Sequence, residues 1–100
     1  MEKRFSSKLP IKHPGELFRS RFLERYNISV QDAATKLHIH RGSLTRFLNG
    51  QSTVSIELAL KLEVATRVSA KFWLSWQNDY DLQRIEDLRQ LKIDAEPLLN

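Results

Sequence analysis

Two short helices with almost no chain between them are the feature that most constrains this sequence. Apolar residues recur at helical spacing in ISVQDAATKL (28–37) and again in RGSLTRFLNG (41–50). Only residues 38–40 remain to connect the two, so the second helix has to cross the first steeply. A close crossing requires a small side chain at the contact, and Ala34 provides one. The chain is therefore predicted to form a tight helical hairpin here.

The apolar positions of this hairpin agree with a specific packing arrangement. Leu44, Phe47 and Leu48 recur at i, i+3 and i+4, which is the stripe of a helix packed on one side. Ala33 and Leu37 fall on the matching side of the first helix. This is how a helix-turn-helix packs its two helices, with the second helix entering the major groove of DNA. A purely structural hairpin would share part of the pattern, but the combined spacing favours DNA binding.

The opposite face of the second helix carries the predicted DNA contacts. At about 100° per residue, its side chains point away from the apolar stripe, and the N-terminal ones would meet base edges. Arginine reads guanine O6 and N7 with its forked donors, although a phosphate contact or a solvated charge is equally compatible with each arginine. Gly42 lacks a Cβ, so backbone and base could approach closely there. The predicted contact residues are His40, Arg41, Gly42, Ser43, Thr45, Arg46 and Asn49.

The two histidines of the turn are interpreted structurally. The pair His38-x-His40 could form half of a metal site, but no cysteine or nearby carboxylate cluster completes it. His38 is expected in the left-handed conformation, which His tolerates better than most residues. His40 is expected to cap the second helix or to touch a phosphate. Because no Ser/His/Asp arrangement or Gly-rich phosphate loop is visible, we expect neither a cofactor nor enzymatic activity.

Composition excludes several classes of protein. One hundred residues with 41% hydrophobic content fit one globular domain, and three Gly and three Pro are too few for the turns of an all-β sandwich. The absence of cysteine excludes a disulfide framework. No apolar run approaches the ~20 residues of a membrane span. The N-terminus also lacks the apolar region of a secretory signal, so we expect a cytoplasmic protein without a membrane partner.

Positive charge is concentrated in the N-terminal half of the chain. Residues 1–50 contain ten basic residues (Lys and Arg) and four acidic residues, whereas residues 51–100 contain six basic and eight acidic residues. A basic half beside a mildly acidic half indicates a polyanion-binding face and a second surface with another role. An unevenly charged, solvated surface would give the same numbers, so charge alone does not decide between the two.

The remaining helices follow from capping residues and apolar periodicity. A first helix is predicted in HPGELFRSRFLERY (13–26), where Pro14 suits the first turn. Ser29, Ser55 and Ser69 are the predicted N-caps of the second, fourth and fifth helices. The predicted fold is all-α, a compact five-helix bundle with a helix-turn-helix and a long C-terminal helix. The predicted buried residues outside the hairpin are Leu17, Phe18, Phe22 and Tyr26, then Ile56, Ala59, Leu60 and Val64, then Phe72, Trp73, Trp76 and Tyr80.

Three segments are expected along the chain. Residues 1–12 lack periodicity and are predicted to form a flexible basic arm, and residues 93–100 to form a frayed tail. Residues 13–92 are predicted to be the helix-turn-helix DNA-binding and dimerisation domain. Dimerisation is expected because the apolar pattern of the last helix continues past the point where a small core could cover it. The predicted interface residues are Leu82, Ile85, Leu88 and Leu91.

Four segments of the chain resemble a known family. HPGELF, LTRFLNG, ALKL and FWLSWQNDYDL occur in the order seen in HigA-type antitoxins, members of the phage-repressor-like Cro/XRE helix-turn-helix group. The resemblance spans about residues 13–85 and implies a homodimeric repressor of its own operon that neutralises a HigB-like toxin, an mRNA-cleaving ribonuclease. The matching positions imply DNA reading by Arg41, Ser43, Thr45 and Arg46, and phosphate contacts by Ser29 and Gln31. The chain departs from the family at three positions. The family usually has Gln at the position of Val30, and Gly at the positions of His38 and Arg67.

The partners follow from this resemblance, and two alternatives stay open. A dimer would read a palindromic operator in double-stranded DNA with two helices about 34 Å apart. The toxin is expected to dock on folded surface of the first helix, at Glu16, Arg19 and Glu24, or on the basic arm. A free-standing transcriptional repressor without a toxin shares every DNA-binding feature, and only FWLSWQNDYDL distinguishes it. An interaction module without a DNA role predicts no salt-dependent duplex binding.

Overall fold

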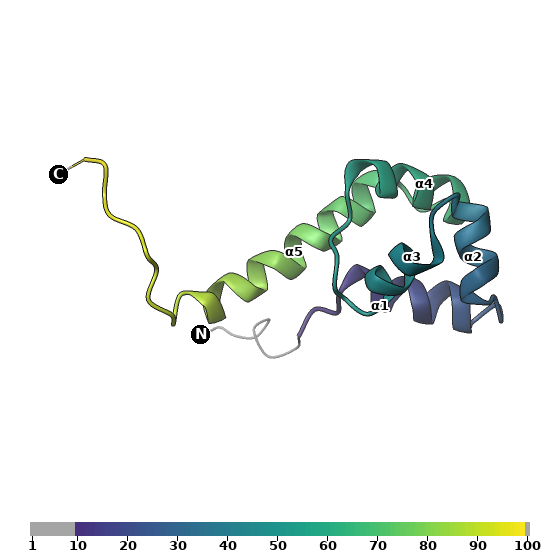
Figure 1. The fold of residues 1–100 in the computed structure, drawn as a ribbon, viewed down its shortest axis with the longest axis horizontal. Coiled ribbons are helices and arrows are strands. Elements are labelled where there is room, and N and C mark those ends of the chain that lie inside the picture. Colours follow the sequence, from purple (N-terminus) through teal and green to yellow (C-terminus); the bar gives the residue numbers. More distant parts are fainter. Residues whose placement is uncertain (1–9, 100) are drawn as a thin grey trace, which may run out of the picture.

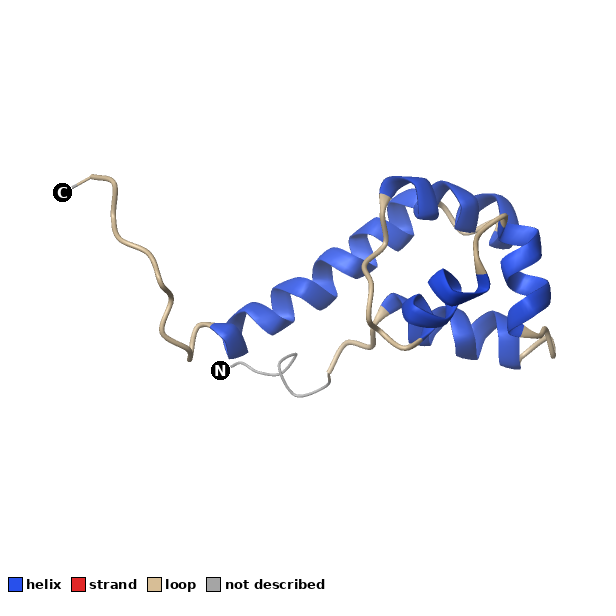
Figure 2. Cartoon of the chain, in the orientation of Figure 1, coloured by secondary structure: helices blue, strands red, loops and turns tan. Residues whose placement is uncertain are grey.

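Every regular element in the described part of this computed structural model, residues 10–99, is a helix (Figure 1, Figure 2). The elements are α1 (Pro14–Phe18), the π-helical segment η2 (Arg19–Glu24), α2 (Val30–Leu37), α3 (Arg41–Leu48), α4 (Ile56–Thr66) and α5 (Ala70–Leu88). The predicted all-α fold is confirmed, with α2 and α3 as the helix-turn-helix and α5 as the long C-terminal helix. Among these residues, no helix has both the length and the apolar character needed to span a membrane.

Serine side chains start three of the helices, as the sequence predicts. The Oγ atoms of Ser29, Ser55 and Ser69 each accept a hydrogen bond from the backbone N–H three residues on, at 3.0, 3.0 and 3.1 Å. The first helix begins differently, because Nδ1 of His13 accepts from the backbone N–H of Gly15 at 2.9 Å. Each cap satisfies a backbone donor that has no partner within its helix.

A tight turn around His38 sets the angle between α2 and α3. His38 ends α2 in the left-handed conformation, with φ 56° and ψ 47°, as predicted. The backbone N–H of Ile39 then donates to the carbonyl oxygen of Ala34 at 3.1 Å, which closes the end of α2. The small side chain of Ala34 is only 1% exposed. Its burial beside the turn supports the close crossing inferred from the sequence.

The core lies between the inner faces of the helices. Leu44 and Phe47 of α3, Leu62 of α4 and Trp73 of α5 are almost completely buried. The ring of Phe18 lies edge-on to that of Trp73, with centroids 6.2 Å apart. Apolar side chains from all parts of the bundle therefore fix the orientation of α3, which forms one wall of this core.

The predicted buried face of α4 is wrong at three of its four positions. Ala59 is buried as predicted, but Ile56, Leu60 and Val64 are 71%, 51% and 83% exposed. The helix instead turns Leu62 inward with Ala59, toward α2 and α5. Apolar residues occupy both sides of α4, so their spacing alone does not show which side packs against the bundle.

Two aromatic residues are also more exposed than predicted. Tyr26 follows the end of η2 and is 61% exposed, because the chain turns there and its side chain no longer shares a face with Phe22. Phe72 is partly exposed at the edge of the core, where its ring stacks on that of Trp76 at a centroid distance of 5.7 Å. Trp73, which lies between Phe72 and Trp76 in the sequence, is the aromatic residue of this segment that is buried in the core.

The two ends of the described chain differ. Near the N-terminus, the backbone N–H of Ile11 donates to Gln83 at 2.7 Å, and the carbonyl oxygen of Lys12 accepts from the indole N–H of Trp76 at 2.7 Å. After α5 the chain extends away from the bundle (Figure 1). Residues 1–9 of the predicted arm and residue 100 of the predicted tail lie outside the described residues.

Candidate nucleic-acid interface

Helix α3 is held in place by its inner face. Leu44, Phe47 and Leu48 are at most 2% exposed. The backbone of α1 rests directly on the C-terminal end of α3, because a methyl group added at Gly15 would overlap the carbonyl oxygen of Phe47 and lie 2.7 Å from its carbonyl carbon. The His13 ring meets the Phe47 ring edge-on, with centroids 5.7 Å apart. Packing of its inner face and of its C-terminal end therefore fixes the position of α3 in the bundle.

The outer face of α3 is exposed and carries most of the predicted DNA contacts. At about 100° per residue, five predicted residues lie on the side away from the buried stripe. They are Arg41, Gly42, Thr45, Arg46 and Asn49, all exposed. Apart from its chain neighbours and the backbone of its own helix, no atom of the fold comes within 4 Å of the position that a Cβ on Gly42 would occupy. This face therefore offers guanidinium, hydroxyl and amide groups around a patch of bare backbone.

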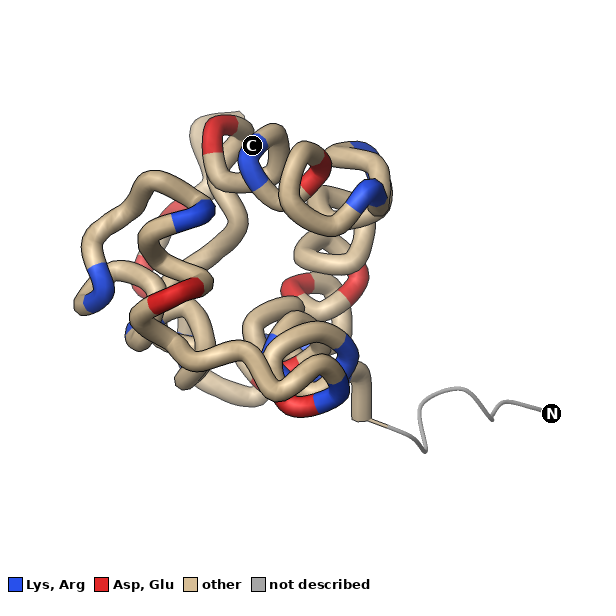
Figure 3. The backbone as a smooth tube through the Cα atoms, turned by 90° about the vertical axis from the view of Figure 1, so that its right-hand side faces the viewer, with Lys and Arg blue, Asp and Glu red and all other residues tan. Residues whose placement is uncertain are grey.

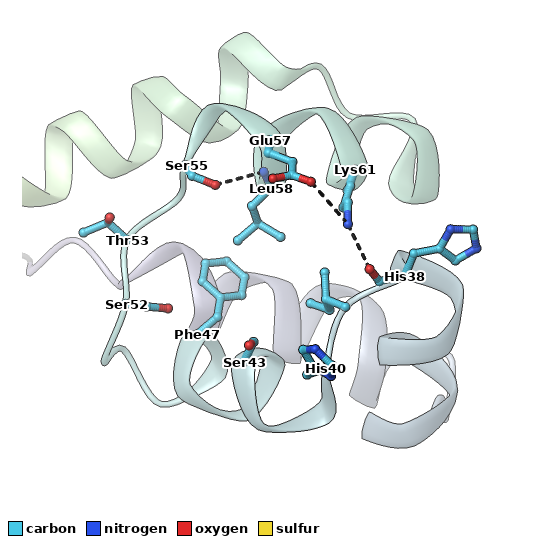
Figure 4. Close-up of a pocket in the computed structure, with 11 residues that line it drawn as sticks. His38, His40, Ser43, Phe47, Ser52, Thr53, Ser55, Glu57, Leu58 and Lys61 are labelled. Atoms are coloured by element: carbon cyan, nitrogen blue, oxygen red, sulfur yellow. Dashed lines mark hydrogen bonds and ion pairs between the residues drawn. The ribbon is translucent and has the colours of Figure 1, made fainter.

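Two other predicted residues, His40 and Ser43, lie at the edge of this face. Both line a cavity of about 380 Å³ between α3 and α4, with Phe47 and Leu58 among its walls (Figure 4). His40 occupies the N-cap position of α3, but its side chain makes no capping hydrogen bond. His40 is thus the N-cap residue as expected, but its side chain does not cap the helix by a hydrogen bond, and its contact with a phosphate stays a prediction.

Lys61 of α4 fastens the turn that precedes α3. Its Nζ donates to the carbonyl oxygen of His38 at 2.9 Å and lies 3.7 Å from a carboxylate oxygen of Glu57 (Figure 4). The imidazole of His38 points away from this cavity. Within residues 10–99, no group of three or more His, Asp or Glu side chains is placed to hold a metal ion. The arrangement around the turn is one of backbone support.

The start of α2 presents the two residues that the family resemblance associates with phosphate. Ser29 and Gln31 are both exposed. The Ser29 hydroxyl is engaged as the N-cap, while the amide nitrogen of Gln31 lies 3.4 Å from the hydroxyl of Thr35. A helix N-terminus has free N–H donors and a partial positive charge, which favour an anion. The chemistry of this end of α2 is therefore compatible with a DNA phosphate.

Arg19 reaches the end of α3. It is predicted to share a toxin-binding surface with Glu16 and Glu24 on the first helix, and both of those carboxylates are exposed. Nη2 of Arg19, however, donates to Oδ1 of Asn49 at 3.0 Å. The two residues are 30 positions apart, so no local sequence pattern signals this contact.

His13 also contributes to this region, although no role was predicted for it from the sequence. Besides capping α1, its ring packs edge-on against Tyr80 of α5, with centroids 5.0 Å apart. Burial lowers the pKa of His13, while a hydrogen bond with the backbone of Ser52 and the carboxylates of Glu16 and Asp81 act in the opposite direction. A signal was available, because a polar residue directly before Pro at a predicted helix start occupies the N-cap position.

The predicted dimer residues lie on the end of α5 and just beyond it. This end of the helix projects from the bundle (Figure 1). Leu82, Leu88 and Leu91 are exposed, and Ile85 is half-buried. A concentration of exposed large apolar side chains in one region is typical of an interaction surface.

Charged residues of both signs are distributed along the backbone. Figure 3 shows Lys and Arg positions interspersed with Asp and Glu around the bundle in that view. The candidate interface is defined by the shape and exposure of the α3 outer face.

Known proteins share this arrangement. Residues 20–73 match the family described as Helix-turn-helix. Virulence-associated protein A of Dichelobacter nodosus is 36% identical over 74 residues, which are 73% of this chain and 72% of that protein. Antitoxin HigA-1 of Vibrio cholerae is 31% identical over 68 residues, which are 68% of this chain and 64% of that protein. Pseudomonas aeruginosa antitoxin HigA, solved with the higBA promoter, is 30% identical with a TM-score of 0.72, covering 89% of this chain and 99% of that one.

These similarities agree with the geometry of the site. The family match covers more than half of the chain and includes both α2 and α3. The similarity to the Pseudomonas aeruginosa antitoxin extends over most of this chain and nearly all of that one. The predicted resemblance is confirmed. The chain belongs to the helix-turn-helix (Cro/XRE-like) family of DNA-binding regulators and antitoxins, which are not enzymes, and is related to the HigA-type antitoxins.

Proposed function

We propose that this protein is an antitoxin that represses its own operon and neutralises a HigB-like, mRNA-cleaving ribonuclease. The observation that carries the DNA-binding part is the exposed outer face of α3, presented by a helix whose inner face is fully packed. The solved HigA structure with promoter DNA supports the same use of this fold. A protein with these partners works in the cytoplasm, where the operon and its mRNA are found.

The proposed reading of the operator divides the site into two kinds of contact. Arg41 and Arg46 read base edges in the major groove, where a bidentate arginine selects guanine. Gly42 allows the backbone of α3 to approach the DNA closely, because nothing of the fold occupies that space. Ser29 and Gln31 hold a phosphate at the start of α2. Ser43, Thr45 and His40 contribute contacts at the edges of the same surface.

Operator binding is tested by titrating a labelled duplex from the protein's own promoter and a scrambled duplex of equal length. We expect tighter binding to the promoter duplex, and affinity for both that falls as salt is raised, because phosphate contacts release counterions. Equal binding to the two duplexes would contradict sequence-specific repression. An absence of binding to either would favour an interaction module without a DNA role.

The proposed dimer places two copies of α3 in successive major grooves, about 34 Å apart. Its support is the end of α5, which projects from the bundle in Figure 1, and the exposure of the apolar side chains of Leu82 and Leu88 on this helix. We expect the double variant Leu82→Glu, Leu88→Glu to sediment as a monomer and to lose most of its operator affinity. Leu60→Glu on α4 is the matched control, because Leu60 is similarly exposed. If the double variant remains a dimer and the Leu60→Glu variant is a monomer, the dimer interface lies on α4 and not on α5.

The toxin surface is proposed on the first helix. Glu16 and Glu24 are exposed there, whereas Arg19 is engaged with Asn49. The antitoxin role is tested by growth rescue: the protein is co-expressed with the product of the adjacent reading frame, which we expect to be a small basic ribonuclease-like toxin. Charge reversal at Glu16 and Glu24 together is expected to weaken that rescue while leaving the helical content intact. Operator binding without rescue of any neighbouring toxin would instead favour a free-standing repressor.

A further inference from the structure

A groove with arginine and aromatic side chains, the arginine groove, lies between the first helix and the start of α5. It encloses about 340 Å³, and its wall on the first helix includes the π-helical segment η2 and the residues that follow it. π-helical turns occur frequently at functional sites. Exposed aromatic rings, here those of Tyr26 and Phe72, are typical of an interaction surface. The groove is lined by Arg21, Phe22, Arg25, Tyr26, Phe72 and Trp73, among others.

Three side chains of the arginine groove lack a polar partner within residues 10–99. The guanidinium groups of Arg21 and Arg25 make no ion pair with a carboxylate there. Like charges four residues apart on a helix repel each other, so these two cations favour an anion beside them. The indole N–H of Trp73 is buried without an acceptor, which costs free energy until an oxygen atom reaches it. The groove therefore suits an acidic peptide segment with free carbonyl groups.

Residues 93–99 (IDAEPLL), the acidic segment, have the matching composition. Its two carboxylates alternate with apolar residues, and every residue of it is exposed. In the described chain, its one hydrogen bond is internal, from the backbone N–H of Ala95 to the carbonyl oxygen of Ile93 at 3.0 Å. The segment follows α5 and extends away from its own bundle (Figure 1). Its carboxylates, carbonyl groups and leucines are therefore available to a second molecule.

We propose that the acidic segment of one protomer binds in the arginine groove of its partner. Its carboxylates, Asp94 and Glu96, pair with the two arginines of the groove. Its leucines cover the aromatic rings, and one of its carbonyl oxygens accepts from the indole N–H of Trp73. The proposal rests on the dimer proposed above and adds a second contact to it. A basic toxin is a poorer occupant, because the arginines of the groove would repel it.

The proposed pairing of two α5 helices brings the acidic segment within reach of this groove. In a two-fold contact the same residues meet on both helices, so an antiparallel pairing through the predicted interface sets Leu91 opposite the partner's Leu82. Asp94 and Glu96 follow Leu91 by three and five residues, which span about 10 and 16 Å in an extended chain. These lengths equal the rise of about seven and eleven helical residues. The two carboxylates therefore lie on either side of the level of Trp73 on the partner's α5.

The experiment measures the dimer dissociation constant by sedimentation equilibrium for a segment variant, Asp94→Lys with Glu96→Lys, and a groove variant, Arg21→Glu with Arg25→Glu. Each is expected to weaken the dimer about tenfold, because a symmetric dimer contains every lost contact twice. The decisive sample is an equimolar mixture of the two variants. Both contacts of the mixed dimer join opposite charges, so the mixture should dimerise about as tightly as the wild type. The control Lys36→Glu changes an exposed cation of α2 outside the groove and should sediment like the wild type.

Three results would overturn the binding of the acidic segment to the partner's groove. A mixture that dimerises no better than the separate variants would show that the segment binds its own groove or neither groove. Wild-type dimerisation of the groove variant, with its helical content intact by circular dichroism, would also reject the proposal. Weaker growth rescue by that variant would then assign the groove to the toxin. If the wild-type protein itself sediments as a monomer at every concentration, the proposed dimer fails, and not only this contact.

Discussion

Gly15 of α1 packs against the C-terminal end of α3, whereas Gly42 lies on the outer face of α3 itself, and the surroundings of the two glycines are opposite. At Gly15, an added methyl group would overlap the carbonyl oxygen of Phe47 and lie 3.1 Å from the Cα of Leu48. At Gly42, an added methyl group would meet nothing within 4 Å. The packing of the fold therefore requires the first glycine. It gives no reason for the second, which lies in the first turn of a helix, where alanine is the better helix former.

This difference shows how the two faces of α3 are constrained. Contacts within the chain fix the inner face, so its residues are determined by packing. The outer face is exposed, and a glycine there costs about 0.5–1 kcal/mol relative to alanine without any gain from the fold. A requirement for Gly42 has to come from outside the chain, and close approach to DNA supplies one. The same glycine-to-alanine change should therefore have opposite effects at the two positions.

The largest effect is expected from Gly15→Ala. The new methyl group would push α1 away from the end of α3, because the atoms it meets belong to rigid helical backbone. We expect the free energy of unfolding to fall by about 3 kcal/mol or more, a large part of the 5–15 kcal/mol of a typical domain. Urea denaturation followed by circular dichroism measures the change. Wild-type stability of this variant would show that α1 can move, and the contrast between the two glycines would disappear.

The next largest effect is expected from Arg41→Ala and Arg46→Ala on the outer face. Each is expected to weaken operator binding by about 1–3 kcal/mol if it reads a base, and to relax the preference at one operator position. Both side chains are exposed, so the unfolding transition should not change. A phosphate contact would instead weaken binding to all sequences alike and lower the salt slope by about one. Unchanged operator binding by both folded variants would remove the outer face of α3 from the DNA interface.

A smaller change is expected from Gly42→Ala, and it sharpens the comparison directly. The free energy of unfolding should rise by up to about 1 kcal/mol, because alanine favours the helix and its methyl group enters empty space. Operator affinity should fall by about tenfold, or 1.4 kcal/mol, if the DNA approaches the bare backbone. Both quantities are measured on the same preparation. Higher stability with undiminished operator affinity would mean that DNA does not require this glycine.

The inner scaffold of the fold could be predicted where its signals are local. Ser29, Ser55 and Ser69 cap their helices as expected, because a cap involves only neighbouring residues. His38 takes the left-handed turn for the same reason. The buried face of α4 could not be predicted, since Leu60 and Leu62 are equally apolar and lie on different sides of the helix. Packing against α2 and α5, which a single sequence does not display, decides between them.

The candidate site shows the same division between local and long-range information. The outer face of α3 follows from the periodicity of one helix, so the exposed position of Arg41 and Arg46 could be predicted without a structure. The contact between Arg19 and Asn49 depends on how α1 crosses the end of α3, and that crossing is permitted by the missing side chain of Gly15. Long-range contacts of this kind leave no spacing pattern in the sequence. The contact between Arg19 and Asn49 is for this reason visible only in the folded chain.

The smallest effect is expected from titration of His13, whose ring packs against Phe47 on the inner face of α3. Burial lowers its pKa below the ordinary value of 6.5, so below pH 6.5 the unfolded chain binds a proton more readily than the folded chain. The contribution of neutral His13 to the free energy of unfolding is therefore complete above pH 6.5. It is lost as the pH falls, because protonated Nδ1 can no longer accept the hydrogen bond from the backbone N–H of Gly15. His13→Asn keeps a capping acceptor but does not titrate. Urea denaturation at pH 7.5 and pH 5.5 should show a smaller loss of stability for this variant than for the wild type, and equal losses would assign the pH dependence to other groups.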